Sequence, residues 1–290
     1  KCPLGLLLGL ALASCSSDSK PAGDGGQSGQ DKAALPEVSV VRPDGAAMPT
    51  KKLDILFLVD TSNSMEQEQR SLAINYAALM TALNADGILP DLHIGFVDAN
   101  LGAGTYNLPS CEKAGASGGK LQNKAAFAGC KAPTDPWISL VGGVVNVPGA
   151  DPNPVTAVTQ AVQCISQLGV GGCGFEQQLE SVRRALDPTL NVNPGFLRPD
   201  AALVVVLLTA EDDCSAADTT LYDPNQQGLT EPLGPLTSFR CTEFGLKCNE
   251  ALRSAGTKTG CVPSGSYLFP VGDYVTFFKG LKTDLSALSV

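Results

Sequence analysis

Hydrophobic residues follow two patterns along the chain, and each pattern predicts a different kind of element. Residues 53–59 and 201–208 are nearly continuous apolar runs, which are typical of strands buried on both faces of a sheet. Residues 91–97 predict a further strand, and residues 137–141 predict a short edge strand. Residues 287–290 resemble the start of another strand, so we expect the sequence to be clipped at its carboxyl end.

The second pattern is the repetition of apolar residues at helical spacing between and after these strands. It predicts helices over residues 65–83, 153–168, 175–186 and 270–281. Strands that alternate with helices indicate an α/β protein with three layers and a mostly parallel sheet.

The end of the first strand carries the most informative polar motif, Asp60-Thr-Ser62-Asn-Ser64. Alternate side chains of an extended turn point the same way, so this carboxylate and these two hydroxyls can converge. A site with oxygen donors alone suits a hard cation, Mg²⁺ first, with Mn²⁺ and Ca²⁺ as alternatives. In the competing interpretation, Ser62 or Ser64 caps the following helix, because Ser64-x-x-Gln67 matches a capping box.

Other acidic residues lie near strand or helix ends and are candidates for additional ligands. They are Glu176, Glu211 and Asp212. Such carboxylates can equally be solvated loop residues or helix-end charges. The single histidine, His93, lies among apolar residues of the second strand, and we expect it to have a structural role.

The charge of the chain excludes one class of partner. The net charge is −9 over 290 residues, with a pI near 4.6. No cluster of Lys or Arg stands out in the sequence. We therefore expect no binding to nucleic acid, and an acidic surface is compatible with divalent cations.

The amino-terminal segment predicts export. Residues 1–15 contain an apolar stretch too short to span a bilayer, as in a signal peptide. Their end, Leu-Ala-Ser-Cys15, resembles the bacterial lipobox, so Cys15 is a candidate for lipidation and outer-membrane anchoring in the cell envelope. An ordinary signal peptide with an incidental cysteine is the alternative. Residues 16–50 have the composition of a flexible Gly/Ser/Asp-rich tether.

The chain contains ten cysteines, and setting aside Cys2 and Cys15 leaves an even number. In an exported chain this implies disulfides that brace the long irregular stretches 99–136 and 214–266. The candidates are Cys111, Cys130, Cys164, Cys173, Cys214, Cys241, Cys248 and Cys261. We predict the local pairs Cys111–Cys130 and Cys164–Cys173, with the remaining four pairing among themselves. The absence of C-x-x-C and the single histidine disfavour zinc.

The order of elements over residues 51–290, together with Asp60-x-Ser62-x-Ser64, resembles a von Willebrand factor type A domain of a lipid-anchored bacterial kind. The resemblance implies a Rossmann-like sheet with helices on both faces and one antiparallel edge strand. It also implies a metal-ion-dependent adhesion site, where both serines bind the cation and a partner's acidic residue fills an open coordination position.

Two positions depart from the pattern of that family. Cys173-Gly174 stands where the family has a threonine from a second loop. Ala210 stands where it has an aspartate from a third loop, and an alanine side chain cannot bind a cation.

Three functions are compatible with the sequence. The first is a surface-tethered, cation-dependent module that engages a carboxylate of an extracytoplasmic protein partner. The second is a metal-independent interaction scaffold, braced by disulfides, that binds through its long loops. The third, a hydrolase, has the least support. Asp60-Thr-Ser62 only distantly resembles the Asp-Thr-Gly turn of aspartic proteases, and the chain has no second turn of this kind to supply the other carboxylate. His93 is the only histidine for a Ser-His triad. We therefore do not expect an enzyme.

Overall fold

The computed structural model describes residues 52–85, 89–111, 116–264 and 266–290. All of these residues belong to one compact unit of the chain. The predicted signal peptide, Cys15 and the predicted tether lie outside the described residues. Within the described part, no helix is both long enough and apolar enough to cross a lipid bilayer.

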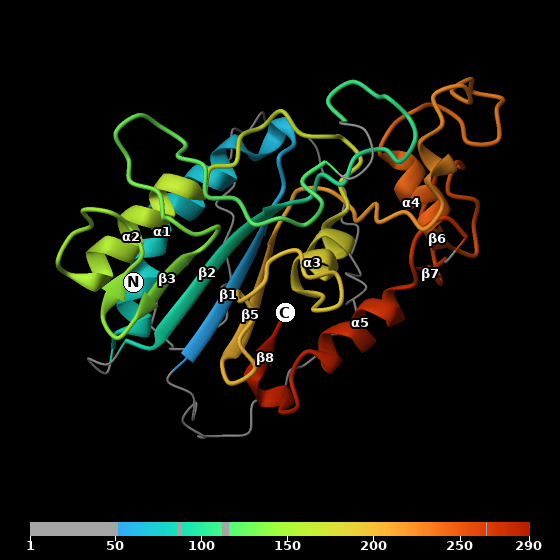
Figure 1. The fold of residues 1–290 in the computed structure, drawn as a ribbon. Coiled ribbons are helices and arrows are strands. Elements are labelled where there is room, and N and C mark those ends of the chain that lie inside the picture. Colours follow the sequence, from blue (N-terminus) through green and yellow to red (C-terminus); the bar gives the residue numbers. More distant parts are fainter. Residues whose placement is uncertain (1–51, 86–88, 112–115, 265) are drawn as a thin grey trace, which may run out of the picture. The chain divides into compact units, whose positions relative to one another are not determined.

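A six-stranded sheet with the order β4-β3-β2-β1-β5-β8 forms the centre of the fold (Figure 1). Its strands are β1 (Lys52–Val59), β2 (Asp91–Asp98), β3 (Ile138–Val141), β4 (Val144–Val145), β5 (Ala202–Leu208) and β8 (Leu288–Ser289). β1 pairs in parallel with β2 and β5, and β5 pairs in parallel with β8. β3 runs antiparallel to β2, and β4 turns back along β3. The mostly parallel sheet is confirmed, but its antiparallel edge is a hairpin and not the single strand that we expected.

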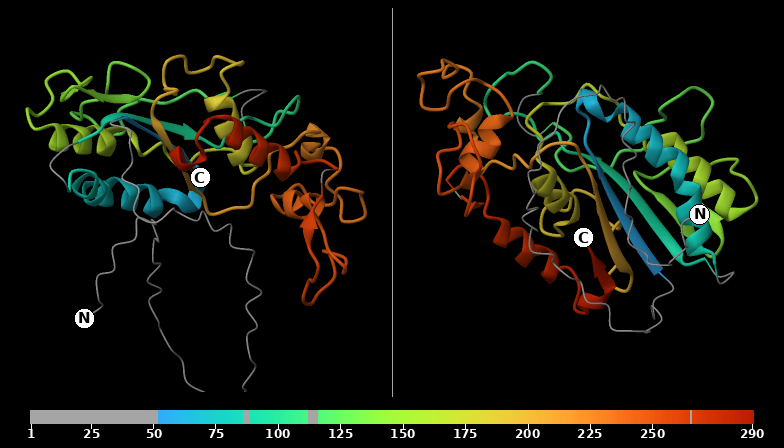
Figure 2. Two further views of the ribbon diagram at one scale, coloured as in Figure 1. Left: turned by 90° about the horizontal axis from the view of Figure 1, so that it is seen from below. Right: turned by 180° about the vertical axis from the view of Figure 1, so that it is seen from behind.

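Helices pack against both faces of this sheet, in agreement with the prediction (Figure 2). α1 (Glu66–Leu83) and α2 (Pro154–Ile165) cover one face, and α3 (Gln178–Leu186) and α5 (Val271–Gly280) cover the other. Successive residues of β1 alternate between the two sides, because side chains along a strand point to opposite faces.

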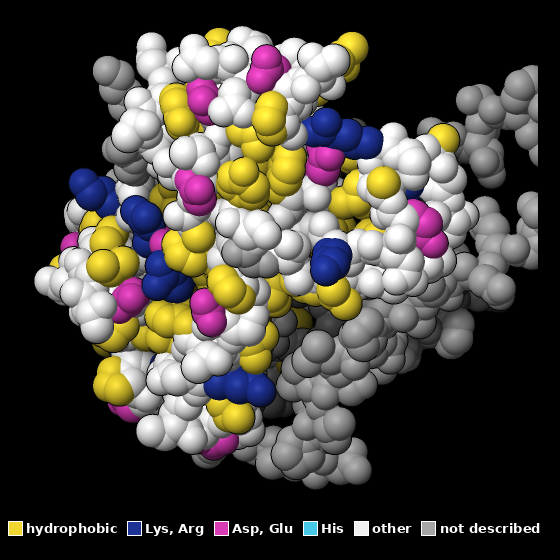
Figure 3. Space-filling view, turned by 90° about the vertical axis from the view of Figure 1, so that its right-hand side faces the viewer, with side chains coloured by type: hydrophobic (Ala, Val, Ile, Leu, Met, Phe, Trp, Pro, Cys, Tyr) yellow, Lys and Arg dark blue, Asp and Glu magenta, His cyan; other side chains and the backbone are white. Residues whose placement is uncertain are grey.

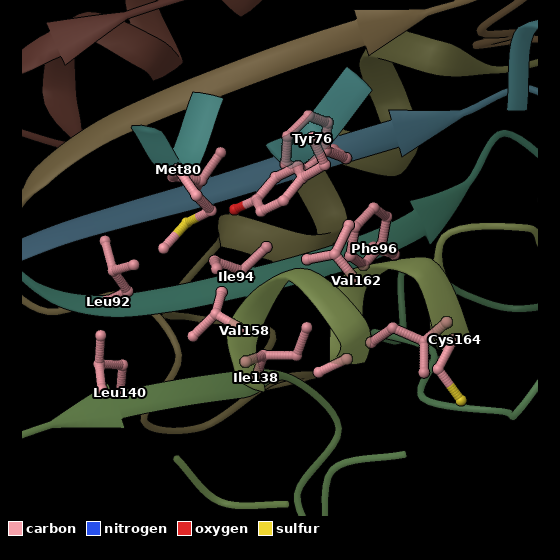
Figure 4. Packing of buried hydrophobic residues seen from close by; sticks show 14 of the residues in the cluster. Tyr76, Met80, Leu92, Ile94, Phe96, Ile138, Leu140, Val158, Val162 and Cys164 are labelled. Carbon is pink, nitrogen blue, oxygen red and sulfur yellow. The ribbon is translucent and has the colours of Figure 1, made fainter. Parts of the chain in front are cut away.

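The face under α1 and α2 holds a closely packed apolar core. Phe57 of β1 stacks on Phe96 of β2 with ring centroids 5.1 Å apart, and Tyr76 of α1 meets Phe57 edge-on. Figure 4 shows Tyr76 and Met80 of α1 above β2, with Val158 and Val162 of α2 beside them. Burial of these large side chains supplies the hydrophobic free energy that fixes the sheet and its strand ends.

The irregular stretch after β5 forms a small substructure around an apolar cluster that it shares with residues 103–111 and 173–175. It contains a 3-10 helix, an α-helix and two short strands, which are η2 (Thr219–Tyr222), α4 (Phe239–Gly245), β6 (Leu246–Lys247) and β7 (Val262–Pro263). Arg240 is 1% exposed and donates hydrogen bonds to the backbone carbonyls of five residues. These are Leu221, Asp223, Gln226, Gly234 and Pro235. One buried guanidinium therefore organises this loop.

Four disulfides link all eight predicted cysteines. They are Cys111–Cys173, Cys130–Cys164, Cys214–Cys241 and Cys248–Cys261. The expectation that the last four cysteines pair among themselves is confirmed. The predicted pairs Cys111–Cys130 and Cys164–Cys173 are wrong, because α2 carries Cys164 to Cys130 and leaves Cys173 beside Cys111.

Candidate functional site

Asp60 lies directly after β1 and is fully buried. Its Oδ1 accepts a hydrogen bond from the backbone amide of Ser62 at 2.7 Å. Its Oδ2 accepts one from the Thr209 hydroxyl at 3.1 Å and one from the Ala210 amide at 3.2 Å. Because Thr209 and Ala210 follow β5, the carboxylate joins the carboxyl ends of two adjacent parallel strands. Open α/β sheets usually bind ligands at this edge.

The two serines of the motif present their hydroxyls to each other. The Oγ atoms of Ser62 and Ser64 lie 3.1 Å apart. Neither side chain caps the short helix η1 (Asn63–Met65) or helix α1, whose N-cap residue is Met65. The capping interpretation is therefore wrong. Ser62 is buried whereas Ser64 is exposed, so the motif opens toward solvent at Ser64.

Glu176 brings a second carboxyl group to this place. Its side chain is 2% exposed, and neither carboxyl oxygen has a hydrogen-bond partner of acceptable geometry among the described residues. Burial, followed by the neighbouring Asp60 carboxyl, raises the pKa of Glu176 to about 9. Burial also acts to raise the pKa of Asp60. Interactions with Glu176 and with the Ser62 and Ala210 amides outweigh it, so the pKa of Asp60 lies below its ordinary value.

No basic side chain in the described part of the chain neutralises these two acids. Among the described residues, no Lys, Arg or His forms an ion pair with Asp60 or Glu176. Asp54, which is equally buried in β1, shows the contrast, because the Arg198 guanidinium lies 2.7 Å from it and the Arg198 amide donates to it at 2.7 Å. One end of β1 thus holds a compensated aspartate and the other end a pair of uncompensated acids.

Glu211 and Asp212, the other predicted acidic ligands, and their neighbour Asp213 lie in different surroundings. Glu211 is exposed, and burial together with the charge of Asp60 raises its pKa, which places it at the rim. Asp212 accepts a hydrogen bond from the Thr242 hydroxyl at 2.5 Å and so points toward α4. Asp213 instead accepts hydrogen bonds from the Leu179 amide and the Ser215 hydroxyl, and thereby caps α3. The structure therefore gathers Asp60, Ser62, Ser64 and Glu176, and leaves Asp212 outside.

A network of amide side chains and close backbone contacts holds the two loops of the site together. Gln69 of α1 donates to the carbonyls of Asp60 at 2.9 Å and Gly169 at 2.8 Å. The Gly172 amide donates to the Thr61 carbonyl at 2.9 Å. Gln69 is not among the residues predicted from the sequence. Its position on the apolar face of a helix is the feature that indicates its role, because a glutamine buried there needs hydrogen-bond partners inside the protein.

Thr209 and Gln178 are also positioning residues that we had not predicted. The Gln178 side-chain amide hydrogen-bonds with the Thr209 hydroxyl at 2.9 Å, and Thr209 in turn donates to Asp60. The sequence feature that could have indicated Thr209 is its position immediately after a central strand. This chain of contacts ties the first turn of α3 to the carboxylate.

The donor set of the site fits a hard divalent cation. The hydroxyls of Ser62 and Ser64 contact each other next to the buried Asp60 carboxylate, and the Glu176 oxygens have no hydrogen-bond partner among the described residues. Within the described residues, no group of three or more His, Cys, Asp or Glu side chains is arranged to hold a metal ion. A cation here would therefore depend on the serine hydroxyls as well, and oxygen-only donors favour Mg²⁺, Mn²⁺ or Ca²⁺.

His93 lies apart from the site, among aromatic rings near the opposite end of β1. Its Nδ1 lies 2.8 Å from the Phe196 carbonyl oxygen, and its ring is 5.7 Å from that of Trp137. Burial lowers the pKa of His93. Because a carbonyl oxygen can only accept, Nδ1 carries the proton that it donates to Phe196. These contacts support the structural role that we predicted.

No protein-family model matches the chain, and no curated protein matches it in sequence. A function must therefore be assigned from the residues of the site and from the fold that positions them.

Proposed function

We propose that this domain is a surface-tethered protein-binding module of the von Willebrand factor type A kind, in which a divalent cation mediates adhesion. The mostly parallel sheet with helices on both faces supports a Rossmann-like fold of that kind. The observation that carries the proposal is the position of Asp60, Ser62 and Ser64 beside a second buried acid, with no cationic partner for either carboxyl group among the described residues.

Asp60, Ser62 and Ser64 are the residues that hold the cation in this proposal, with Mg²⁺ preferred and Mn²⁺ or Ca²⁺ possible. When bound, the cation supplies a Lewis-acidic position to which a carboxylate of the protein partner can attach. The exposed Ser64 marks the side from which the partner approaches. Hydrogen bonds from Ser62 and Ala210 fix the Asp60 carboxylate before any ligand arrives, which lowers the cost of organising the site.

The two departures from the family pattern have structural counterparts here. Cys173 forms a disulfide with Cys111 and is not a ligand. At Ala210 the backbone amide donates to Asp60, so this position orients the aspartate without supplying a side chain.

A calorimetric titration of the folded domain with MgCl₂, MnCl₂ and CaCl₂ tests the proposal. We expect saturable binding below millimolar cation, and we expect Asp60→Asn to abolish it. Asn preserves the shape of the side chain and one of its two oxygen acceptors, but its amide nitrogen cannot accept the hydrogen bonds of the other oxygen. Circular dichroism of the variant therefore accompanies the titration to show that it is folded. Lys52→Gln, at the far end of β1, is the matched control. The proposal is wrong if the wild type binds no cation at millimolar concentration, or if Asp60→Asn binds as the wild type does.

We propose further that residues 1–15 direct export and that Cys15 carries a lipid that anchors the protein in the bacterial cell envelope, with residues 16–50 as the tether. The composition of these segments supports this. Radiolabelled palmitate incorporation that is lost in Cys15→Ser would support it, and equal labelling of the variant would contradict it.

A metal-independent interaction scaffold is the second candidate, and the exposed apolar residues of the loop substructure and α5 favour it. Phe239 is 47% exposed, Val262 54% and Val271 46%. Figure 3 shows the side of the molecule that carries these elements, where hydrophobic side chains lie among scattered charged ones. Partner binding that survives EDTA and Asp60→Asn would favour the scaffold over the cation-dependent module.

A hydrolase has less support than either binding function. The Asp60–Glu176 pair resembles the carboxyl dyads of acid hydrolases, which share one proton. However, Asp60 is fully buried and Glu176 is 2% exposed, so a peptide or ester bond cannot reach them in this arrangement. We therefore propose no catalytic step.

A further inference from the structure

We propose that Glu176 is a direct ligand of the cation and the second anionic group of the site. This inference rests on the proposed function, and it changes the ligand set from one carboxylate with two hydroxyls to two carboxylates with two hydroxyls. Glu176 would thereby replace the oxygen ligands that Cys173 and Ala210 cannot provide.

The carboxyl group of Glu176 is orphaned inside the protein. Both of its oxygens are buried, and neither has a hydrogen-bond partner of acceptable geometry among the described residues. A buried acid without partners is costly, because its desolvation is not compensated. Hydrogen bonds place the segment that carries Glu176 against the motif. The Gly172 amide donates to the Thr61 carbonyl at 2.9 Å, and Gln178 hydrogen-bonds with Thr209, which donates to Asp60. The mutual influence of Asp60 and Glu176 on their pKa values agrees with this placement. A bound cation is the partner that this group lacks.

Glu180, one turn further along the chain, shows how a buried glutamate is otherwise satisfied in this protein. It is equally buried at 2% exposed. Arg183 donates to both of its oxygens at 2.7 Å, and the Arg184 Nε donates at 3.0 Å. Tyr274 adds its hydroxyl at 3.3 Å. Glu180 thus has two arginine partners, whereas Glu176 has no basic partner among the described residues. This contrast supports a ligand from outside the chain as the partner of Glu176.

The backbone around Glu176 is held in place from several sides. The Glu176 carbonyl accepts a hydrogen bond from the Cys214 amide at 2.7 Å, and the Gln177 amide donates to the Ala99 carbonyl at 2.9 Å. Cys173 is bonded to Cys111. The fold therefore fixes the position of the Glu176 backbone, and Glu176 does not lie in an unconstrained loop.

Two carboxylates balance the charge of a divalent cation in a buried site, whereas one carboxylate leaves an excess positive charge. We therefore expect Glu176 to contribute strongly to affinity and to favour divalent over monovalent cations. Glu211 at the rim is exposed to solvent, where its charge is screened and should matter little.

The test is a titration of the full folded chain with MnCl₂, in which the electron paramagnetic resonance signal of free Mn²⁺ reports binding. Glu176→Gln keeps the shape of the side chain and prevents it from becoming a carboxylate when the cation binds. We expect it to weaken Mn²⁺ binding by about 10-fold or more, as loss of supporting ligand interactions does in other metal sites. Glu211→Gln is the matched control, and we expect a change below about 3-fold because exposed charges interact weakly.

Thermal unfolding in EDTA separates loss of a ligand from damage to the fold. If Glu176 has no role other than to bind the cation, Glu176→Gln should be about as stable as the wild type without metal, because an uncharged amide replaces a carboxyl group of the same shape. A variant that is less stable than the wild type in EDTA would show a structural role and would overturn the inference.

Failure of this inference is distinguishable from failure of the proposed function. If Asp60→Asn abolishes Mn²⁺ binding while Glu176→Gln binds like the wild type, Glu176 is not a ligand and the cation-dependent module stands. If the wild type binds no Mn²⁺, both are overturned.

Discussion

At the scale of single residues, the site depends on how closely two loops approach each other at Gly172. The Gly172 amide donates to the Thr61 carbonyl, and a Cβ at position 172 would overlap the Thr61 side chain. Thr61 lies between Asp60 and Ser62, so any movement that relieves this overlap shifts the motif itself. A Cβ at the neighbouring Gly171 would meet no atom within 4 Å, so the restriction is specific to one glycine.

We therefore predict that Gly172→Ala lowers the free energy of unfolding by about 1–3 kcal/mol, the usual cost of overpacking. Urea denaturation measures this directly. Gly171→Ala is the control, and we expect a change within about 0.5 kcal/mol because nothing opposes the added methyl group. Equal effects of the two substitutions would contradict the close approach of Gly172 to Thr61.

Residue types and their spacing predicted part of the site. Asp60, Ser62 and Ser64 were predictable, because a carboxylate and hydroxyls at alternate positions after a buried strand must point in similar directions. The proximity of Glu176 was only one of several possibilities, since its distance from Asp60 depends on how a loop more than a hundred residues later folds back. Asp212 looked equally suitable in the sequence, but its contact with Thr242 turns it away.

At the scale of elements, α3 is anchored by a buried ionic cluster around Glu180. Burial alone would raise the pKa of Glu180, but hydrogen bonds from Arg183 and Arg184 outweigh it and hold the pKa below its ordinary value. A carboxylate whose pKa is lower in the folded state stabilises the protein above its unfolded pKa. That stabilisation is lost as the pH falls through the folded pKa.

We predict that Glu180→Gln destabilises the domain at pH 7 by about 1–3 kcal/mol, because arginine hydrogen bonds to a charged acceptor are lost. The difference from the wild type should shrink as the pH falls below about 4, where the unfolded carboxyl group is already protonated. Urea unfolding from pH 7 to pH 3 provides the measurement. A difference that is constant over this range would contradict the assigned charge of Glu180.

The disulfides also act at the scale of elements, and they differ in distance from the site. Cys111–Cys173 bridges 62 residues and fixes the loop that carries Glu176, whereas Cys248–Cys261 bridges 13 residues in the loop substructure. Replacing Cys111 and Cys173 together with Ser should weaken Mn²⁺ binding, because the Glu176 loop loses its covalent attachment. Replacing Cys248 and Cys261 together should leave Mn²⁺ binding unchanged, although both changes reduce stability by about 3–4 kcal/mol in the loop-entropy model. Equal Mn²⁺ affinity of the two double variants would contradict this role.

Element boundaries show what periodicity can predict and what it cannot. The apolar runs placed β1, β2 and β5 within a residue or two, because strands buried on both faces admit few polar residues. α3 begins at Gln178, later than the predicted residue 175, because the Cys111–Cys173 disulfide and the bond from the Cys214 amide hold the preceding residues in a loop. The β3–β4 hairpin was missed, although Gly142-Gly143, both with positive φ, is a hairpin signal.

At the scale of the whole molecule, the two ends of β1 have opposite electrostatic character. At the amino end, Arg198 compensates Asp54, and Lys282 donates to the Arg198 carbonyl at 2.6 Å. At the carboxyl end, Asp60 accepts hydrogen bonds from one hydroxyl and two backbone amides, and neither Asp60 nor Glu176 has a basic partner among the described residues. The fold thus pairs the buried acid at one end of the sheet with its own arginine and gives the acids at the other end no basic partner among the described residues. If a cation binds there as proposed, its binding free energy adds to the stability of the folded domain.

We therefore predict that divalent cations raise the melting temperature of the domain. A ligand at 100 times its dissociation constant adds about 2.7 kcal/mol of stability if it binds only the folded state. For a domain of this size, that free energy corresponds to a shift of roughly 5–10 °C. Calorimetric melts in MgCl₂ and in EDTA, matched in ionic strength with NaCl, measure the shift. Asp60→Asn should remove it, whereas Lys52→Gln should preserve it. A shift of the same size in Asp60→Asn would show that the cation stabilises the protein by binding elsewhere. If the wild type shows no shift, the uncompensated acids do not bind a divalent cation under these conditions.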